Sequence, residues 1–206
     1  MTRLMLVRHG LTEYNVTRRF AGSSDVELSP LGCQQVVKLR ERLADQPVDC
    51  VYCSDLRRAR VTAEMLTDGR DVPVTACLEL REVDYGECEG LTFSQIKERY
   101  PEVAERVVAP DKGLEFPGGE SFAAMVDRIT RFKERLAQHA ASDNVLIVSH
   151  SGPLRSLVCS LLGISQGCWR QLRIDNASLS IVDTYQFGAI LSLLNGTSHL
   201  KALPKP

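Results

Sequence analysis

The sequence has no excess of charge of one sign, because 25 lysine and arginine residues oppose 26 aspartate and glutamate residues, for a net charge of −1. Proteins that coat nucleic acid or an anionic membrane depend on a strong positive surplus. We therefore expect no nucleic acid and no membrane among the partners, while small basic clusters at single sites remain allowed. Low-complexity runs are absent as well, and 44% hydrophobic with 25% charged residues is typical of an ordinary folded domain.

Long hydrophobic runs are absent too. Apolar stretches such as residues 4–7 and 145–148 are far shorter than the roughly 20 residues that cross a bilayer. The first residues carry a single early positive charge, Arg3, and their apolar run is too short for a signal peptide. The expected location is the cytoplasm.

The cysteines do not form the framework of a secreted, disulfide-rich protein. There are seven of them, an odd number, and their positions are scattered. We expect reduced thiols. Cys50 and Cys53 have C-x-x-C spacing, but no second pair accompanies them and the segment is typical of a strand, so packing is favoured over a metal or redox role. Neither a metal nor another cofactor is expected.

Short apolar segments alternate with longer segments of helical periodicity, which predicts an α/β fold with helices around a mixed, mostly parallel sheet. The expected strands span residues 4–7, 48–54, 73–77, 145–149, 171–184 with a break near Asn176, and 189–194. The expected helices span residues 30–46, 56–66, 93–100, 122–136 and 154–162. We expect one domain over residues 1–206, with an irregular, lid-like excursion at about 97–121 that is rich in proline and glycine.

Two histidines follow apolar strands in the same way. His9 and His150 each stand two residues beyond a predicted buried strand, and small residues follow each of them. Ligands of open α/β sheets bind outside the carboxyl ends of the strands, so we expect the two imidazoles to meet in one crevice. His139 and His199 have no such context and are interpreted as structural.

Arginines occur at the same ends of the predicted strands. Arg8 precedes His9, and Arg57, Arg58 and Arg60 follow the strand at 48–54. A guanidinium group has a fixed charge and a planar set of donors that suits phosphate oxygens, which predicts an anionic ligand. Arg58 is expected to face this ligand, whereas Arg57 and Arg60, on the outer side of the helix, either contact the ligand or form ordinary ion pairs with surface carboxylates.

Residues 6–15, Leu-Val-Arg-His-Gly-Leu-Thr-Glu-Tyr-Asn, resemble the R-H-G-x-T-x-x-N signature of the histidine phosphatase superfamily, in its phosphoglycerate mutase-like branch. Further segments match in the family's order over nearly the whole chain, at residues 19–29, 54–63, 80–90, 119–121 and 148–152. The resemblance implies a three-layer α/β/α fold, a reaction that passes through a phosphohistidine, and no metal.

The resemblance places the nucleophile on His9 and the acid that protonates the leaving oxygen on Glu82. It places the phosphate pocket on four polar side chains: Arg8, Arg58, His150 and Asn15. The physical chemistry agrees, since two neighbouring arginines keep a nucleophilic imidazole neutral. The second ring nitrogen of His9 then needs an acceptor, commonly a backbone carbonyl. An adjacent phosphate dianion and partial burial would keep Glu82 protonated, so that it acts first as an acid and then as a base.

Other matches are less specific. Ala21 and Gly22 correspond to positions whose backbone lines the substrate pocket, although Ala21 lacks the hydroxyl that is common in mutases. Ser151 stands where mutases often have glycine, and either contributes an amide or hydroxyl to the phosphate or simply fills a turn. Two further carboxylates, Glu87 and Glu89, are expected to be solvated. Glu120 is expected to cap a helix or to brace the site.

Hydrolysis is favoured over mutase activity. Residues 97–112 hold four basic and four acidic residues, so this segment offers no second cationic clamp for a bisphosphate. The length and residues 194–200 resemble broad-specificity and α-ribazole phosphatases, and the expected substrate is a phosphorylated small molecule such as α-ribazole phosphate. The alternatives are a cofactor-dependent phosphoglycerate mutase and a non-catalytic protein that binds a phosphorylated ligand; a homodimer is possible.

Five apolar residues suit either a bulky leaving group or the core: Val103, Val107, Val108, Phe116 and Phe122.

Overall fold

The computed structural model describes residues 1–109 and 113–204. Within these residues the chain forms a six-stranded sheet in the order β3-β2-β4-β1-β5-β6. The strands β3, β2, β4 and β1 pair with one another in parallel, whereas β5 pairs antiparallel with both β1 and β6, so the sheet is mixed, as predicted. In chain order the strands are β1 (Thr2–Arg8), β2 (Cys50–Ser54), β3 (Val74–Cys77), β4 (Asn144–Ser149), β5 (Leu179–Tyr185) and β6 (Gly188–Gly196).

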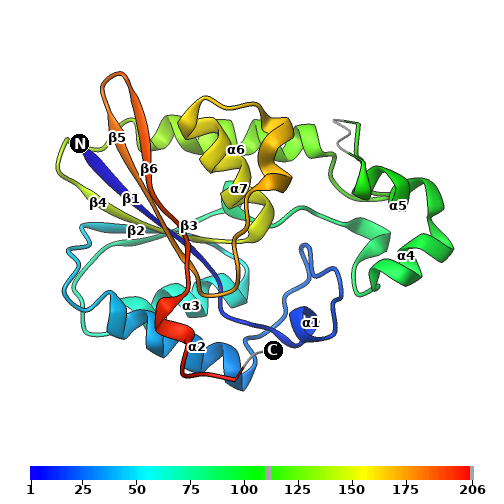
Figure 1. Cartoon of the computed structure of the whole chain (residues 1–206), viewed down its shortest axis with the longest axis horizontal. Helices are drawn as coiled ribbons and strands as arrows, with labels where there is room; N and C mark the ends of the chain where they lie inside the picture. The colour runs from blue at the N-terminus through cyan, green and yellow to red at the C-terminus, as the bar shows by residue number, and fades with distance from the viewer. Residues whose placement is uncertain (110–112, 205–206) are drawn as a thin grey trace.

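Helices cover both faces of the sheet. Figure 1 shows α2 and α3 on one face and α6 and α7 on the other, while α4 and α5 extend beyond the sheet to one side. The helices are α1 (Glu13–Val16), α2 (Pro30–Arg42), α3 (Arg57–Thr67), α4 (Phe93–Arg99), α5 (Pro101–Val108), α6 (Phe122–Leu136) and α7 (Ser151–Leu162). None of the helices in the described ranges is long and apolar enough to span a membrane.

The central strands β1 and β4 are buried on both faces because their middle residues, 4–7 and 145–148, are all apolar. In β1, Leu4 and Leu6 pack into the cluster beneath α6 and α7, whereas Met5 and Val7 pack into the cluster beneath α2 and α3. Side chains of a strand alternate between the two faces of the sheet, so a strand with a continuous apolar run must be covered by other elements on both faces. This arrangement leaves the carboxyl ends of β1, β2 and β4 as the place where polar side chains gather.

Two segments differ from the sequence-based prediction. The predicted break near Asn176 is present, because the chain turns at Ala177 (φ +50°), whose amide donates to the carbonyls of Arg8 and His9. Residues 171–175 before it form no strand. β5 therefore begins only at Leu179. The excursion expected to be irregular contains α5, which Pro101 starts at the first helical position. Its residues 110–112 lie outside the described part of the chain.

Candidate active site

The two predicted strand ends lie side by side. β1 and β4 pair in parallel with Arg8 opposite Ser149, and the His9 amide donates to the Ser149 carbonyl at 3.0 Å. The next residues, His9 and His150, therefore leave the sheet together. Their ring centroids are 5.0 Å apart, with an angle of 58° between the ring planes. The prediction that the two imidazoles meet is confirmed.

A cleft of about 210 Å³ opens above these strand ends. Most of the side chains that the sequence singled out line it: Arg8, His9, Asn15, Ala21, Gly22, Arg58, Glu82 and Ser151. His150 is fully buried, with its ring against His9. The sequence reasoning missed four further residues of the lining: Arg18, Arg19, Phe20 and Tyr85.

The hydrogen bonding of His9 determines which ring nitrogen can react. Its Nδ1 lies 2.7 Å from the carbonyl oxygen of Gly10, so Nδ1 carries the proton and Nε2 keeps its lone pair. A backbone carbonyl is the acceptor that the sequence analysis expected. Burial, followed by the charges of Arg58 and Arg8, holds the pKa of His9 well below its ordinary value. The imidazole is therefore neutral around neutral pH and available as a nucleophile.

Two arginines bring positive charge to the cleft. Arg58, at the start of α3, is 1% exposed and donates to the carbonyls of Gly22 at 2.6 Å and Ser24 at 2.7 Å. Arg8 donates to the carbonyl of Ile174 at 2.9 Å. Burial lowers the pKa of both guanidinium groups, but arginine stays charged at any ordinary pH. Both arginines are anchored by neutral carbonyls, so their charge is left for a ligand.

The neighbouring arginines, for which two roles were open, form surface ion pairs. Arg57 pairs with Glu27 at 2.7 Å and Arg60 pairs with Glu64 at 3.6 Å. All four of these side chains are more than half exposed, so each pair contributes at most about 1 kcal/mol to stability. Only the middle arginine of this helix start, Arg58, enters the site.

Three donors or acceptors of the site are buried without a hydrogen-bond partner in the described part of the chain: Arg8 Nε, Arg58 Nε and His150 Nδ1. The other ring nitrogen of His150 lies 2.8 Å from the hydroxyl of Ser54. Burial and the charge of Arg58 hold the pKa of His150 well below its ordinary value. A buried polar atom without a partner costs about 1–3 kcal/mol, and three of them around one imidazole indicate a site built for an anionic ligand.

Glu82 is fixed at the wall of the cleft by two amides. Its Oε1 accepts from Val83 at 3.0 Å and from Gly152, in the first turn of α7, at 3.2 Å. A Cβ at Gly152 would lie 2.6 Å from this oxygen, so only glycine lets the carboxylate approach the helix. Arg128 supports the same loop by donating to the backbone carbonyl of Glu82 at 3.1 Å.

The side-chain amide of Asn15 is oriented by the hydrogen bonds that its oxygen accepts. Its Oδ1 accepts from the amide and hydroxyl of Thr12 at 3.1 and 3.0 Å, and from Asn176 Nδ2 at 3.0 Å. The Asn15 amide nitrogen is thereby left toward the cleft that the residue lines. Asn176, which the sequence analysis noted only as a break in a strand, also donates to the His9 carbonyl at 3.2 Å.

The carboxylates outside the cleft stabilise its loops. Glu89 accepts from the amides of Ser23 and Ser24 at 2.5 and 2.8 Å, and from the Ser24 hydroxyl. The prediction of a solvated Glu89 was wrong, because this carboxylate holds the loop that supplies the carbonyl partners of Arg58. Glu120 braces the site as expected, by accepting from Arg128 at 2.7 and 2.9 Å.

The remaining histidines and cysteines have structural surroundings. His139 lies 3.1 Å from Asp143 and 3.0 Å from the hydroxyl of Tyr52, and His199 lies 2.9 Å from the carbonyl of Ala177. All seven cysteines are free thiols. Nowhere in residues 1–109 and 113–204 do three or more histidine, cysteine, aspartate or glutamate side chains gather in a way that could hold a metal ion.

A second cavity, of about 80 Å³, adjoins the cleft and shares Phe20 and Tyr85 with it. Its other lining residues are Val83, Val107, Leu114, Phe116, Phe122, Trp169 and Arg170. Three of the apolar residues proposed for a leaving group, Val107, Phe116 and Phe122, thus face a cavity. Val103 belongs to the core and Val108 is 69% exposed.

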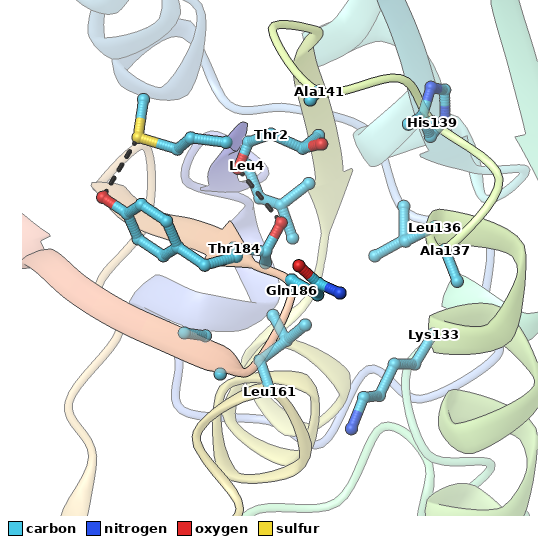
Figure 2. A pocket seen from close by; sticks show the side chains of 14 residues that line it. Thr2, Leu4, Lys133, Leu136, Ala137, His139, Ala141, Leu161, Thr184 and Gln186 are labelled. Atoms are coloured by element: carbon cyan, nitrogen blue, oxygen red, sulfur yellow. Dashed lines mark hydrogen bonds between the residues drawn. The ribbon is translucent and has the colours of Figure 1, made fainter.

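A larger cavity, about 560 Å³, lies away from His9 and His150. It lies at the start of β1, where Thr2 and Leu4 face Lys133 and Leu136 of α6, and Thr184 bonds to the Thr2 carbonyl (Figure 2). β1 rises by about 3.3 Å per residue, so the length of the strand separates this cavity from His9. It contains none of the residues that carry the predicted chemistry.

Comparison with known proteins agrees with this geometry. Phosphoserine phosphatase 1 of Hydrogenobacter thermophilus is 32% identical over 97% of this chain and 95% of that protein. The adenosylcobalamin/alpha-ribazole phosphatase of Salmonella typhimurium is 34% identical over 94% of this chain and 96% of its own length. The crystal structure of the alpha-ribazole phosphatase from Shigella flexneri superposes with a TM-score of 0.89 at 32% identity, covering 95% of this chain and 96% of that one.

The family model of the histidine phosphatase superfamily (branch 1) matches residues 4–197. The match extends from Leu4 in β1 to Thr197, directly after β6, so it includes His9, His150 and all of the sheet except the first two residues of β1. The phosphoglycerate mutase-like α/β fold expected from the sequence is confirmed. The chain therefore belongs to branch 1 of the histidine phosphatase superfamily and is a phosphoric monoester hydrolase.

Proposed function

We propose that this chain is a metal-independent phosphatase that hydrolyses small organic phosphate monoesters through a phosphohistidine on His9, with residues 1–206 acting as one domain. The observation that carries the proposal is the set of unpartnered buried atoms on Arg8, Arg58 and His150 around a neutral imidazole. A phosphoryl group would supply the negative oxygens that these atoms lack.

In the first step the Nε2 lone pair of His9 attacks phosphorus, and the bond between phosphorus and the ester oxygen breaks. Protonated Glu82 donates its proton to that leaving oxygen, so the alcohol departs neutral. Arg8, Arg58 and His150 stabilise the charge on the oxygens of the transferring group, which is the main contribution a protein makes to phosphoryl transfer.

In the second step a water molecule attacks the phosphorus of the phosphohistidine. The Glu82 carboxylate takes a proton from this water, the bond between phosphorus and Nε2 breaks, and inorganic phosphate leaves. Asn15, the backbone of Ala21 and Gly22, and Ser151 at the start of α7 complete the binding surface, since all of them line the cleft.

The test uses p-nitrophenyl phosphate with a chelator present throughout. We expect chelator-resistant turnover, acid-labile phosphate on the protein after rapid quenching, and a loss of at least about a thousandfold in His9→Ala. Glu82→Gln should still release a burst of p-nitrophenolate, because this leaving group needs no proton, but the second step should be slow and the phosphohistidine should accumulate.

Turnover without phosphorylated protein, or turnover that survives in His9→Ala, would overturn the mechanism. Binding of phosphate esters without any turnover would instead favour the non-catalytic alternative. Transfer to a second hydroxyl of a phosphoglycerate, when a bisphosphate is supplied, would favour the mutase. Asp111 and Lys112, part of the neutral segment that favours hydrolysis, lie outside the described residues.

The names of the relatives suggest two kinds of substrate to test first. One relative is a phosphoserine phosphatase and the other an α-ribazole phosphatase, so the screen should include a phosphorylated amino acid and α-ribazole phosphate. The ratio kcat/KM for each compound ranks them, because it measures the difference in transition-state stabilisation. The oligomeric state, including a homodimer, stays a prediction that sedimentation can test.

A further inference from the structure

Arg155 is a half-buried cation that the proposed chemistry does not use. It lies on α7, it is only partly accessible to solvent, and its Nε is buried without a hydrogen-bond partner in the described part of the chain. Arg128 shows what a structural arginine looks like in this protein, since it donates both to the Glu120 carboxylate and to the carbonyls of Glu79, Arg81 and Glu82. Within the described part of the chain, no comparable set of hydrogen bonds holds Arg155 in place.

The helix places Arg155 one turn behind a residue that lines the cleft. Residues four apart lie on the same face of an α-helix, and Ser151, four residues before Arg155, lines the cleft. The charge of Arg155 interacts with those of Glu82 and Asp175, and Glu82 belongs to the lining of the cleft. Arg155 is therefore near the group proposed to protonate the leaving oxygen.

On its other side Arg155 meets the wall of the second cavity. Its guanidinium carbon lies 5.9 Å from the ring centroid of Trp169, and Trp169 in turn stacks on Phe122 with centroids 4.9 Å apart. Both aromatic residues line the cavity of about 80 Å³ that adjoins the cleft. Stacking on an indole ring holds a guanidinium in place but does not neutralise it.

The phosphoryl group already has its own cations. Arg8 and Arg58 lie beside His9 and carry the unpartnered nitrogens described above, so a phosphate at His9 does not need a third arginine near Glu82. A guanidinium on the leaving-group side matches a second anionic group of the substrate instead. A carboxylate fits best, because its two oxygens match the planar fork of arginine donors and a small cavity admits only a short chain.

We propose that Arg155 is a specificity-determining residue that binds a carboxylate on the leaving group of the substrate. The inference rests on the proposed phosphatase function and narrows its substrate class to short phosphorylated carboxylic acids. Burial lowers the pKa of Arg155, which agrees with a cation held ready for an anion.

The kinetic test compares two esters that differ only in the group to be recognised. These are 3-phosphoglycerate, which carries a carboxylate, and glycerol 3-phosphate, which carries a neutral hydroxymethyl group in its place. We expect the unchanged protein to prefer 3-phosphoglycerate in kcat/KM. Arg155→Met should lower that value by about 10–100-fold, as expected for the loss of a desolvated charge contact, and change it less than about threefold for glycerol 3-phosphate. Arg155→Lys should restore part of the preference.

The matched control is Arg131→Met, which removes the same charge from an exposed position on α6 and should leave the preference unchanged. An equal loss for both esters, accompanied by a displaced pH profile, would mean that Arg155 acts only through Glu82 and would overturn the proposal. An unchanged preference in Arg155→Met would overturn it as well. Thermal unfolding of each variant shows whether the fold is intact.

A binding experiment separates this inference from the proposed function. Calorimetry in a His9→Ala background measures the affinity for both compounds without turnover. Tighter binding of 3-phosphoglycerate, lost when Arg155→Met is added, supports the role of Arg155 even if hydrolysis fails. Equal affinities in both backgrounds reject it, while a lack of turnover of any ester by the unchanged protein counts against the phosphatase proposal alone.

Discussion

His9 and His150 are buried as neutral imidazoles, which links the stability of the protein to pH. Burial is the largest cause of the lowered pKa of each ring, and the positive charges of Arg58 and Arg8 act in the same direction. In an unfolded chain the same side chains titrate near pH 6.5. Below that pH the unfolded state binds more protons than the folded state, so the free energy of unfolding falls as the pH falls.

We expect the free energy of unfolding to decrease between pH 7.5 and pH 5.5, by up to about 1.4 kcal/mol per pH unit below 6.5 for each buried histidine. Replacing one of them, as in His9→Gln, should make this dependence shallower. Urea unfolding at several pH values measures it. His199, whose pKa burial also lowers, is retained in the variant and contributes equally to both curves. If the free energy of unfolding depended on pH equally in the unchanged protein and in His9→Gln, the expectation would be contradicted.

At the scale of elements, the start of α2 holds the loop that carries His9. Ser29 caps the helix by accepting from the amide of Gly32 at 3.1 Å, and its hydroxyl donates to the carbonyl of Leu11 at 3.1 Å. The backbone approach is close: a Cβ on Gly32 would collide with the Leu11 carbonyl oxygen and lie 2.8 Å from its amide nitrogen. A Cβ on Gly10, directly after His9, would likewise lie only 2.7 Å from the carbonyl oxygen of Gly32.

Gly32→Ala should therefore destabilise the protein by about 2 kcal/mol or more, because the added carbon must displace backbone rather than a flexible side chain. It should also lower kcat, since the displaced loop carries His9. Urea unfolding and p-nitrophenyl phosphate turnover measure the two effects. The control is Gly167→Ala, where the nearest atom to a new Cβ is the Ser165 hydroxyl at 3.5 Å and the change should be small. Equal effects of the two substitutions would contradict this account of the loop.

The sequence predicted the elements whose residues carry their own signal. The apolar run of β1 and the spacing within α6 needed no tertiary information, and two histidines after buried strands had to meet once those strands paired. Contacts between distant segments left no such signal. Nothing local shows that Ser54 would bond to His150, or that Glu89 would hold the loop at Ser23 and Ser24.

The strand predicted at residues 171–175, before the break near Asn176, was wrong for the same kind of reason. Its residues are compatible with an extended chain. However, Asn176 and Ala177, which follow them, donate hydrogen bonds to backbone carbonyls at the end of β1 and directly after it. Tertiary hydrogen bonds thus overrode a local preference. The deviation is at the site itself, where the turn at Ala177 brings Asn176 to Asn15.

At the scale of the whole molecule, the cleft exists only when the fold is complete. Its walls come from the end of β1, the start of α3, the loop after β3 and the start of α7, which are separated by most of the chain (Figure 1). An unfolded chain cannot present these groups together. A ligand of the cleft therefore binds the native state alone and must stabilise the entire molecule.

Inorganic phosphate should act as such a ligand, because it is the product of the proposed reaction and matches the unpartnered nitrogens of Arg8 and Arg58. At a hundred times its Kd it should raise the free energy of unfolding by about 2.7 kcal/mol, measured by urea unfolding with chloride at equal ionic strength as the reference. Arg58→Met should abolish this gain. Arg57→Met, which removes the adjacent exposed guanidinium paired with Glu27, should keep it. A gain that chloride reproduces, or that Arg58→Met retains, would mean that the anion binds elsewhere on the surface.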